Sequence, residues 1–218
     1  MDKIKIISLN CQGVNCPKKR RDVFNYIRAK NYSIVCLQDT HITSSIEHLV
    51  EAEWGYKTIF SSYKSNSRGV ALLFRNNFEF VIHNTYRDNY GNIILLDISI
   101  TDQRLTFVNI YGPNGDCSDF YDRLKENILK QGNDGIIIVG DWNLLLDPPT
   151  DGLNYKHINN PNARNAVLNL MTDLKLFDVW REENGDKQMY TWKRRLGGNK
   201  IQMGRLDFFL VSETLFSL

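Results

Sequence analysis

Polar side chains that could bind a metal ion or a phosphate follow the most apolar stretch of the chain. Residues 136–139 read Ile-Ile-Ile-Val, which predicts a buried strand because consecutive β-branched side chains fit the interior of a sheet. Gly140 allows a close turn, and Asp141 and Asn143 follow it. In an extended chain a spacing of two places both side chains on one face. A carboxylate and an amide at the mouth of a sheet suit a metal or phosphate site, and a plain polar turn is the alternative.

Four other polar residues follow or end apolar runs in the same way. They are Asn10, Asp39, Tyr111 and Asp207. If these strand ends meet in one fold, their oxygen atoms suit a hard cation. Mg²⁺ takes one or two carboxylates, keeps several waters and leaves room for substrate phosphate oxygens.

The sequence lacks the patterns of several other chemistries. No Cys/His set has the spacing of a zinc site, and neither a GxxxxGK[ST] loop nor a GxGxxG fingerprint is present. The histidines, at 41, 48, 83 and 157, are scattered and offer no obvious serine-type triad.

Composition indicates one domain over residues 1–218, with 42% hydrophobic and 24% charged residues. The 27 basic and 25 acidic residues leave a net charge of +2, so net charge alone does not indicate a polyanion partner. The four cysteines show neither a CxxC pair nor disulfide-scaffold density, which favours a reduced, intracellular setting with the thiols buried as small hydrophobes. No secretory leader or membrane-spanning run is evident, and we expect no membrane association.

Hydrophobic periodicity and turn residues predict the elements that must position these side chains. We expect strands at 4–10, 34–38, 58–62, 69–75, 80–84, 93–100, 105–110, 136–139, 189–192 and 205–211, and helices at 18–30, 118–130 and 162–175. Ser118 is the expected N-cap of the second helix. Residues 147–161 are an expected long loop, and 193–204 a basic, glycine-containing turn. Strands dominate with dispersed helices, which predicts an α/β fold of two packed mixed sheets flanked by helices.

Six motifs occur in the order and spacing of the endonuclease/exonuclease/phosphatase superfamily. They are Ser8-Leu9-Asn10, Leu37-Gln38-Asp39-Thr40-His41, Asn109-Ile110-Tyr111-Gly112-Pro113-Asn114, Gly140-Asp141-Trp142-Asn143, Tyr190-Thr191-Trp192 and Gly204-Arg205-Leu206-Asp207. With Gly-Val-Ala-Leu-Leu at 69–73, the chain resembles most the apurinic-endonuclease-like domain at the N-terminus of LINE-type non-LTR retrotransposon proteins. The resemblance covers nearly the whole chain and implies a four-layer α/β/β/α sandwich.

The resemblance implies hydrolysis of a phosphodiester that leaves a 3′-hydroxyl and a 5′-phosphate, with Mg²⁺ or Mn²⁺ as cofactor. Asp39 stands where the family has its metal-binding Glu, and Asn10 lies beside it. Because the Asp side chain is one methylene shorter, we expect the metal to be shifted or bound through water.

The same resemblance implies roles for four further residues. Asp141 would activate or orient the attacking water, and Asn143 would position that water and the phosphate. Tyr111 would contact the phosphate. Asp207 would orient a histidine from the closing Ser-Asp-His motif, which does not occur up to Leu218. We therefore expect a C-terminally incomplete domain that lacks its last strand or strands, leaves a sheet edge unpaired and has impaired activity.

The resemblance also implies DNA contacts. Lys193, Arg194 and Arg195, with Lys200, occupy the hairpin that reaches into target DNA in LINE-type endonucleases. The other basic run, at 18–21, is read as a solvated helix start.

Three further residues are candidate DNA contacts. Asn114 matches a DNA-facing position, while Arg68 and His41 have an ordinary surface location as the alternative. Trp142 and Trp192 are expected to be packing residues that wall the site.

The leading hypothesis is a Mg²⁺-dependent endonuclease that nicks double-stranded target DNA for target-primed reverse transcription. It would be part of a longer protein with a reverse transcriptase, and would act inside the cell, in the nucleus. The alternatives are an apurinic-site endonuclease or another phosphoesterase of the superfamily, and a non-catalytic DNA-binding module.

Overall fold

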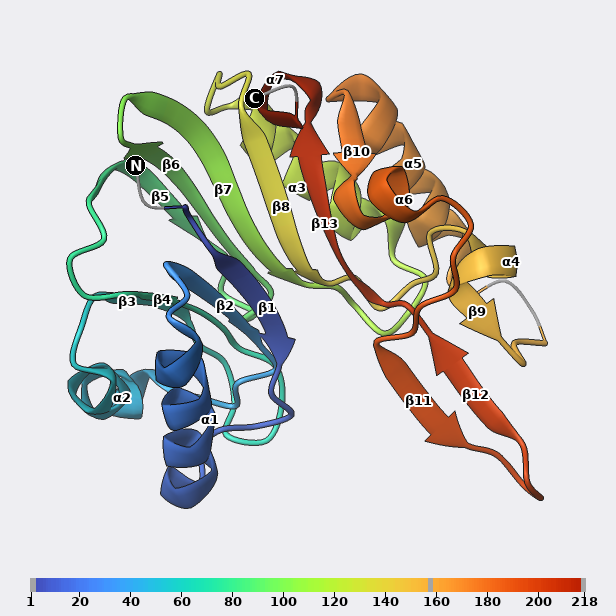
Figure 1. Cartoon of the computed structure of the whole chain (residues 1–218), viewed down its shortest axis with the longest axis horizontal. Helices are drawn as coiled ribbons and strands as arrows, with labels where there is room; N and C mark the ends of the chain where they lie inside the picture. Colours follow the sequence, from blue (N-terminus) through green and yellow to red (C-terminus); the bar gives the residue numbers. More distant parts are fainter. Residues whose placement is uncertain (1–2, 157–158, 217–218) are drawn as a thin grey trace. The chain divides into compact units, whose positions relative to one another are not determined.

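The computed structural model describes residues 3–156 and 159–216. The chain forms two compact units, here called unit 1 (Met1–Tyr111 with Val139–Asp141) and unit 2 (Gly112–Ile138 with Trp142–Leu218). Strand β8 (Ile136–Asp141) begins in unit 2 and ends in unit 1 (Figure 1).

Unit 1 begins with a four-stranded mixed sheet in the order β1-β2-β4-β3. Its strands are β1 (Ile6–Asn10), β2 (Ile34–Gln38), β3 (Thr58–Ser61) and β4 (Val70–Phe74). Strands β1 and β2 are parallel, with Asn10 opposite Gln38, and the other pairs are antiparallel. The polar residues at the carboxyl ends of β1 and β2 therefore leave the sheet at the same edge.

Two helices pack on one face of this sheet (Figure 1). They are α1 (Pro17–Lys30) and α2 (Glu47–Trp54), the latter preceded by a 3-10 turn η1 (Ser44–Ile46). Phe24 and Ile27 of α1 and Trp54 of α2 share one buried cluster with side chains of β2 and β4. The sequence did not predict α2, because only Val50 and Trp54 of its eight residues are buried and the stripe is too short to stand out.

The second sheet of unit 1 is an antiparallel meander of β5 (Phe80–Arg87), β6 (Ile93–Ile100) and β7 (Gln103–Tyr111), in the strand order β8-β7-β6-β5. A buried amide on β7 joins it to the first sheet. Asn109 Nδ2 donates to the carbonyls of Leu37 (3.1 Å) and Ala71 (2.9 Å), and its Oδ1 accepts from Gln38 Nε2 (2.7 Å). Each polar atom of the Asn109 side chain is thus satisfied where the two sheets pack.

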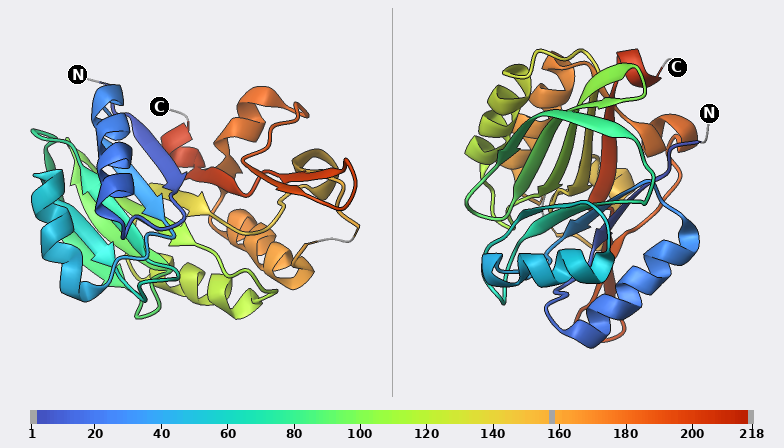
Figure 2. Two further views of the ribbon diagram at one scale, coloured as in Figure 1. Left: turned by 90° about the horizontal axis from the view of Figure 1, so that it is seen from below. Right: turned by 90° about the vertical axis from the view of Figure 1, so that its left-hand side faces the viewer.

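Unit 2 contains the remaining elements. They are α3 (Ser118–Leu129), α4 (Pro148–Asp151), β9 (Gly152–Leu153), α5 (Pro161–Asp173), β10 (Leu176–Asp178), α6 (Val179–Asn184), β11 (Trp192–Arg195), β12 (Ile201–Gly204), β13 (Asp207–Ser212) and α7 (Glu213–Phe216). Strands β10, β13 and β8 are neighbours, in that order, in one sheet. Strands β11, β12 and β9 form a small separate sheet, also in that order. Helices α3 and α5 lie side by side (Figure 2).

The predicted α/β class of two mixed sheets flanked by helices is confirmed. Unit 1 contains three layers, namely a layer of helices and two sheets. Unit 2 contains further strands together with helices α3 and α5. The expectation of a single domain stays a prediction. No helix among the described residues is long and apolar enough to cross a membrane.

Several local expectations were wrong. Of the expected strand at 189–192 only Trp192 is in a strand. Residues 193–204, expected as a turn, are mostly strands β11 and β12, which form the hairpin that the resemblance implied. The expected loop at 147–161 contains α4 and β9, and β10 and α6 were not predicted. These pieces are too short, or too charged, to show a hydrophobic period.

Three residue-level expectations also fail. The N-cap of α3 is Cys117 rather than Ser118, and Cys117 makes no side-chain capping bond. Cys16 is exposed and Cys117 is half-buried, so only Cys11 and Cys36 are buried as expected. Within the basic run, Arg20 is 4% exposed and pairs with Glu53 (2.6 Å), although its charged neighbours are solvated as expected.

Candidate active-site residues

Asn10 and Asp141 join the ends of β1 and β8 within unit 1. Asn10 Nδ2 donates to Asp141 Oδ2 at 2.7 Å, and Asn10 Oδ1 accepts the backbone N–H of Gln12 at 3.0 Å. The two bonds use opposite ends of the amide, so its orientation is fixed. Asp141 is 5% exposed, and a buried carboxylate needs such a donor to keep its charge.

Close contact between β8 and β7 places Asp141 beside the end of β7. Gly140 has φ +151°, and a Cβ atom there would overlap the carbonyl oxygen of Ile110. Tyr111, the last residue of β7, is half-buried, and both its backbone polar groups bond to Asn92. Gly140 therefore allows strands β7 and β8 to lie close together, because a larger residue there would overlap the Ile110 carbonyl.

Asp39 lies directly after β2, in a left-handed conformation with φ +52°. Asp tolerates this region better than most residues. Its Oδ1 accepts the backbone N–H of Arg68 (3.0 Å) and lies 3.0 Å from His41 Nε2. In the described part of the chain no protein donor bonds to Oδ2, so one oxygen is anchored and the other is available.

The oxygen atoms of this region fit Mg²⁺ by their chemistry. The described residues contain no group of three or more His, Cys, Asp or Glu side chains that could hold a metal. Mg²⁺ does not need such a cage, because it is commonly bound through one or two carboxylates plus water and phosphate. Asp39 Oδ2 would hold the ion, with Asn10 at the end of the neighbouring parallel strand.

The turn between β3 and β4 adds one cation, Lys64, that was not predicted, beside the predicted Arg68. An isolated bridge joins Lys64 to Ser67, and the Tyr63 ring has Lys64 Nζ at 5.2 Å and the Arg68 guanidinium at 5.1 Å from its centroid. The Arg68 backbone bonds to Asp39, so this basic turn is tied to the candidate metal ligand. A tyrosine followed directly by Lys64 and then by Arg68 in a short turn was the available signal in the sequence.

Asn143 belongs to unit 2 and lies outside β8, with φ +54°. The expectation that Asp141 and Asn143 lie on one face of an extended strand was wrong, because β8 ends at Asp141 and the chain is not extended at Asn143. Its Nδ2 donates to the Gly112 carbonyl (2.7 Å), and its own carbonyl accepts from Asn160 Nδ2 (3.0 Å). Asn160 Nδ2 also reaches the carbonyl of the exposed Asn114 (3.3 Å).

Trp142 is a packing residue, as expected. It is fully buried and stacks on Phe208 with centroids 4.8 Å apart. Its backbone N–H donates to the Leu206 carbonyl (2.8 Å), and its Nε1 donates to the Phe208 carbonyl (3.1 Å). Trp142 thus fixes the start of β13, where Asp207 lies.

Asp207 is the half-buried first residue of β13. The hydroxyl oxygen of Thr191 accepts the backbone N–H groups of Leu206 (3.0 Å) and Asp207 (3.2 Å). Burial raises the pKa of Asp207, and a hydrogen bond with the Thr191 side chain lowers it by less. The Thr191 hydroxyl therefore fixes the backbone at Asp207.

Strands β11 and β12 form an exposed arm, here called the basic hairpin (Figure 1). Lys193, Arg194, Arg195 and Lys200 are all exposed on it. Arg194 bonds to Gln202 Oε1 (2.8 Å) and lies 5.7 Å from the half-buried Trp192 ring. The predicted cluster of solvent-exposed positive charge is present.

A buried ion network holds the base of the basic hairpin. Arg205 is 2% exposed, and its guanidinium bonds to Asp151 (2.7 and 3.1 Å) and to Asp178 (2.5 and 3.2 Å). Arg181 also pairs with Asp151. These groups tie the β12–β13 junction to α4 and to the start of α6.

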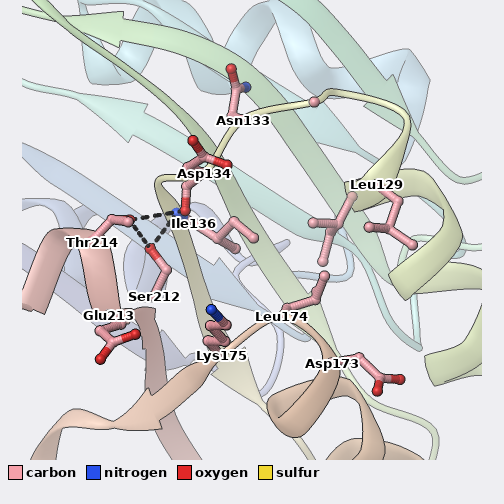
Figure 3. Close-up of a pocket in the computed structure, with 12 residues that line it drawn as sticks. Leu129, Asn133, Asp134, Ile136, Asp173, Leu174, Lys175, Ser212, Glu213 and Thr214 are labelled. Atoms are coloured by element: carbon pink, nitrogen blue, oxygen red, sulfur yellow. Dashed lines mark hydrogen bonds between the residues drawn. The ribbon is translucent and has the colours of Figure 1, made fainter.

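A pocket of about 380 Å³ lies elsewhere in unit 2 (Figure 3). It is lined by the start of β8 and the end of β13, where Ser212 Oγ accepts the Ile136 N–H (2.9 Å). None of the predicted site residues lines it. It is not the candidate active site.

The structure divides the predicted residues between the units. Asn10, Asp39, His41, Arg68, Tyr111 and Asp141 lie in unit 1, and Asn114, Asn143, Lys193, Arg194, Arg195 and Asp207 lie in unit 2. Direct contacts join Asn10 to Asp141, and join Asp39 to His41 and Arg68. His157 lies outside the described residues.

Comparison with known families identifies what these residues belong to. The sequence model of the endonuclease/exonuclease/phosphatase family matches residues 7–218. The chain belongs to this family. Its members are nucleases and phosphatases, so the oxygen-rich strand ends lie in a chain of phosphoester-hydrolase ancestry.

The chain is similar to proteins of two kinds. It is 26% identical to the transposon TX1 uncharacterized 149 kDa protein of Xenopus laevis over 98% of this chain and 16% of that protein. The AP endonuclease LMAP from Leishmania major has a similar fold, with a TM-score of 0.79, 18% identity and coverage of 98% and 80% of the two chains. The endonuclease domain of TRAS1, a telomere-specific non-LTR retrotransposon, has a TM-score of 0.68, 13% identity and coverage of 99% and 88%.

Proposed function

We propose that this chain is a metal-dependent endonuclease that nicks double-stranded DNA and leaves a 3′-hydroxyl and a 5′-phosphate. It would act as one domain of a longer retrotransposon protein, in which a reverse transcriptase extends that hydroxyl. The observation that carries the proposal is the buried carboxylate of Asp141, fixed by the Asn10 amide at adjoining strand ends. A nuclear location would follow from a genomic DNA substrate.

The chain's own residues supply a hydrolytic mechanism. Asp141 would accept a proton from the attacking water, and the Asn10 amide keeps the carboxylate in place. Tyr111 would donate to the phosphate, and Asn143 would orient the water. Mg²⁺ or Mn²⁺ held by Asp39 would neutralise the charge that grows on the phosphate and the leaving oxygen.

Two cationic elements support a nucleic-acid substrate over a small phosphate ester. The basic hairpin is exposed, and the turn that carries Lys64 and Arg68 is hydrogen-bonded to Asp39. Basic groups of this kind neutralise backbone phosphates. The similarity to a transposon protein supports the retrotransposon setting.

The proposal is tested by nicking of supercoiled plasmid with Mg²⁺, with Mn²⁺ and with EDTA. We expect metal-dependent relaxation, and a loss of about a hundredfold or more in Asp141→Asn, which keeps the shape and removes the base. Asp102→Asn, in the exposed β6–β7 turn, is the matched control and should nick normally. The nicked ends should be extended by a polymerase without prior phosphatase treatment. Absence of relaxation with either metal, or full activity of Asp141→Asn, would overturn the proposal.

The similarity of fold to AP endonucleases makes apurinic-site cleavage the second candidate. Intact duplexes and duplexes with one abasic site separate the two. We expect cleavage of the intact duplex, whereas cleavage confined to the abasic duplex would favour the second candidate. Binding of both duplexes without cleavage would favour a non-catalytic module.

A further inference from the structure

Thr191 lies where the basic hairpin leaves the body of unit 2. Its backbone N–H donates to the Gly204 carbonyl (3.0 Å), and the first hairpin pair, Trp192 with Gly204, follows at once. The first basic residue, Lys193, is two positions further along. A displacement of Lys193 therefore acts on Thr191 through only one intervening residue, Trp192.

The Thr191 hydroxyl is also the contact between this strand and Asp207. Its oxygen accepts the backbone N–H groups of Leu206 (3.0 Å) and Asp207 (3.2 Å). One hydroxyl thus joins the hairpin to the backbone of Asp207, a predicted site residue. Removing it would leave two backbone donors without their partner.

The other strand of the hairpin ends on a rigid anchor. The guanidinium of Arg205, between Gly204 and Leu206, is buried and makes four hydrogen bonds to Asp151 and Asp178. Its backbone N–H donates to the Asp151 carbonyl (2.9 Å). Buried ion pairs therefore hold this strand of the hairpin, whereas the Thr191 hydroxyl links the other strand to Leu206 and Asp207.

We propose that Thr191 is a positioning residue that couples the seating of the basic hairpin on a DNA backbone to the placement of Asp207. The inference rests on the proposed function for its ligand and its reaction. When Lys193, Arg194 and Arg195 engage phosphates, strand β11 becomes fixed, and the Thr191 hydroxyl transmits that order to Leu206 and Asp207.

The test compares Thr191→Val, which keeps the shape and removes the hydroxyl, with Thr191→Ser, which keeps the hydroxyl. We expect Thr191→Val to bind a 20-base-pair duplex in EDTA within about twofold of the wild type. Its kcat for nicking should fall about tenfold with KM little changed, since an interaction that acts in the reaction step is lost. Thr191→Ser should restore kcat to within about threefold.

A second readout does not require cleavage. Amide hydrogen exchange at Leu206 and Asp207 is measured with and without the duplex in EDTA. We expect DNA to slow exchange at both amides in the wild type and in Thr191→Ser, and to have no effect on them in Thr191→Val. A triple variant that keeps Thr191 but has Lys193, Arg194 and Arg195 changed to Gln should also show no slowing of exchange at Leu206 and Asp207 by DNA.

The outcomes separate the two proposals. If the wild type nicks no duplex, the proposed function fails, and the amide experiment alone decides the role of Thr191. If the wild type nicks and Thr191→Val keeps its kcat and its slowed exchange, the inference fails alone. Equal loss of kcat in Thr191→Ser, or loss of duplex binding in Thr191→Val, would show a merely structural role and overturn it.

Discussion

Individual site side chains are oriented by neighbouring protein groups. The Asn10 amide is fixed at both ends, Oδ1 of Asp39 is anchored by Arg68 and His41, and the Thr191 hydroxyl holds Asp207. Groups that are positioned in advance lose little freedom when a substrate arrives, which is the condition for efficient catalysis.

Holding Asp207 in a partly buried position has a cost that depends on pH. Burial raises the pKa of Asp207 above its ordinary value of 3.8. The folded protein then binds more protons than the unfolded chain just above that value, so stability falls as the pH rises through this interval. We expect Asp207→Asn to be more stable than the wild type at neutral pH, with the gain lost below a pH of about 3.8.

Urea unfolding at neutral pH and at about pH 3 measures this difference. Asp102→Asn, an exposed carboxylate, is the control and should change stability little at either pH. Lower stability of Asp207→Asn at neutral pH would contradict the expectation. Higher stability of Asp207→Asn at neutral pH would indicate that the carboxyl group of Asp207 is retained at the expense of stability.

At the scale of elements, the approach of β8 to β7 depends on one glycine. A Cβ atom at Gly140 would overlap the Ile110 carbonyl oxygen, and that atom belongs to a strand that cannot easily move. We expect Gly140→Ala to lower the free energy of unfolding by about 1–3 kcal/mol. Gly197→Ala is the matched control, because a Cβ atom there meets no atom within 4 Å and φ is not in the left-handed region. Equal stabilities of the two variants would show that β8 can shift away from β7.

The buried ion network at the base of the basic hairpin should matter more than ion pairs on the surface. Arg205→Met leaves Asp151 and Asp178 buried without their main partner, and we expect a loss of about 3–5 kcal/mol. Lys125→Met removes the partially exposed pair with Asp173 and should cost less than about 1 kcal/mol. Chemical denaturation of both variants measures the contrast, and similar losses would argue against a special role for the network.

At the scale of the whole molecule, a nearly neutral protein carries concentrated positive charge. The net charge is +2, yet three consecutive basic residues stand exposed on one arm. If Lys193, Arg194 and Arg195 contact phosphates, changing all three to Gln should reduce the slope of log K against log salt by about 2–3. Changing Lys18, Lys19 and Arg21 to Gln removes the same charge from α1 and should leave the slope nearly unchanged. Equal effects of the two triple variants would indicate a response to net charge rather than contact by the hairpin.

Much of the fold was predictable from short-range pattern. The buried strands and the helices α1, α3 and α5 were placed close to their observed bounds, because apolar side chains recur there with a clear period. Helix α2, strand β10 and helix α6 were missed. They are short or highly charged, and they are stabilised by tertiary packing rather than by their own pattern.

Two features of the site are written in the order of the amino acids: which residue types could do the chemistry, and that each one follows or ends an apolar run. The tertiary structure decided which of them meet. Asn10 and Asp141 are 131 residues apart and touch only because the first sheet packs on the second, with β1 and β8 ending at the same place. Asn143, two residues from Asp141, leaves the strand because the backbone turns at φ +54°. The pattern of a sequence shows local periodicity only. Contacts between side chains that are distant in the sequence depend on strand order and sheet packing, which arise only when the whole chain folds.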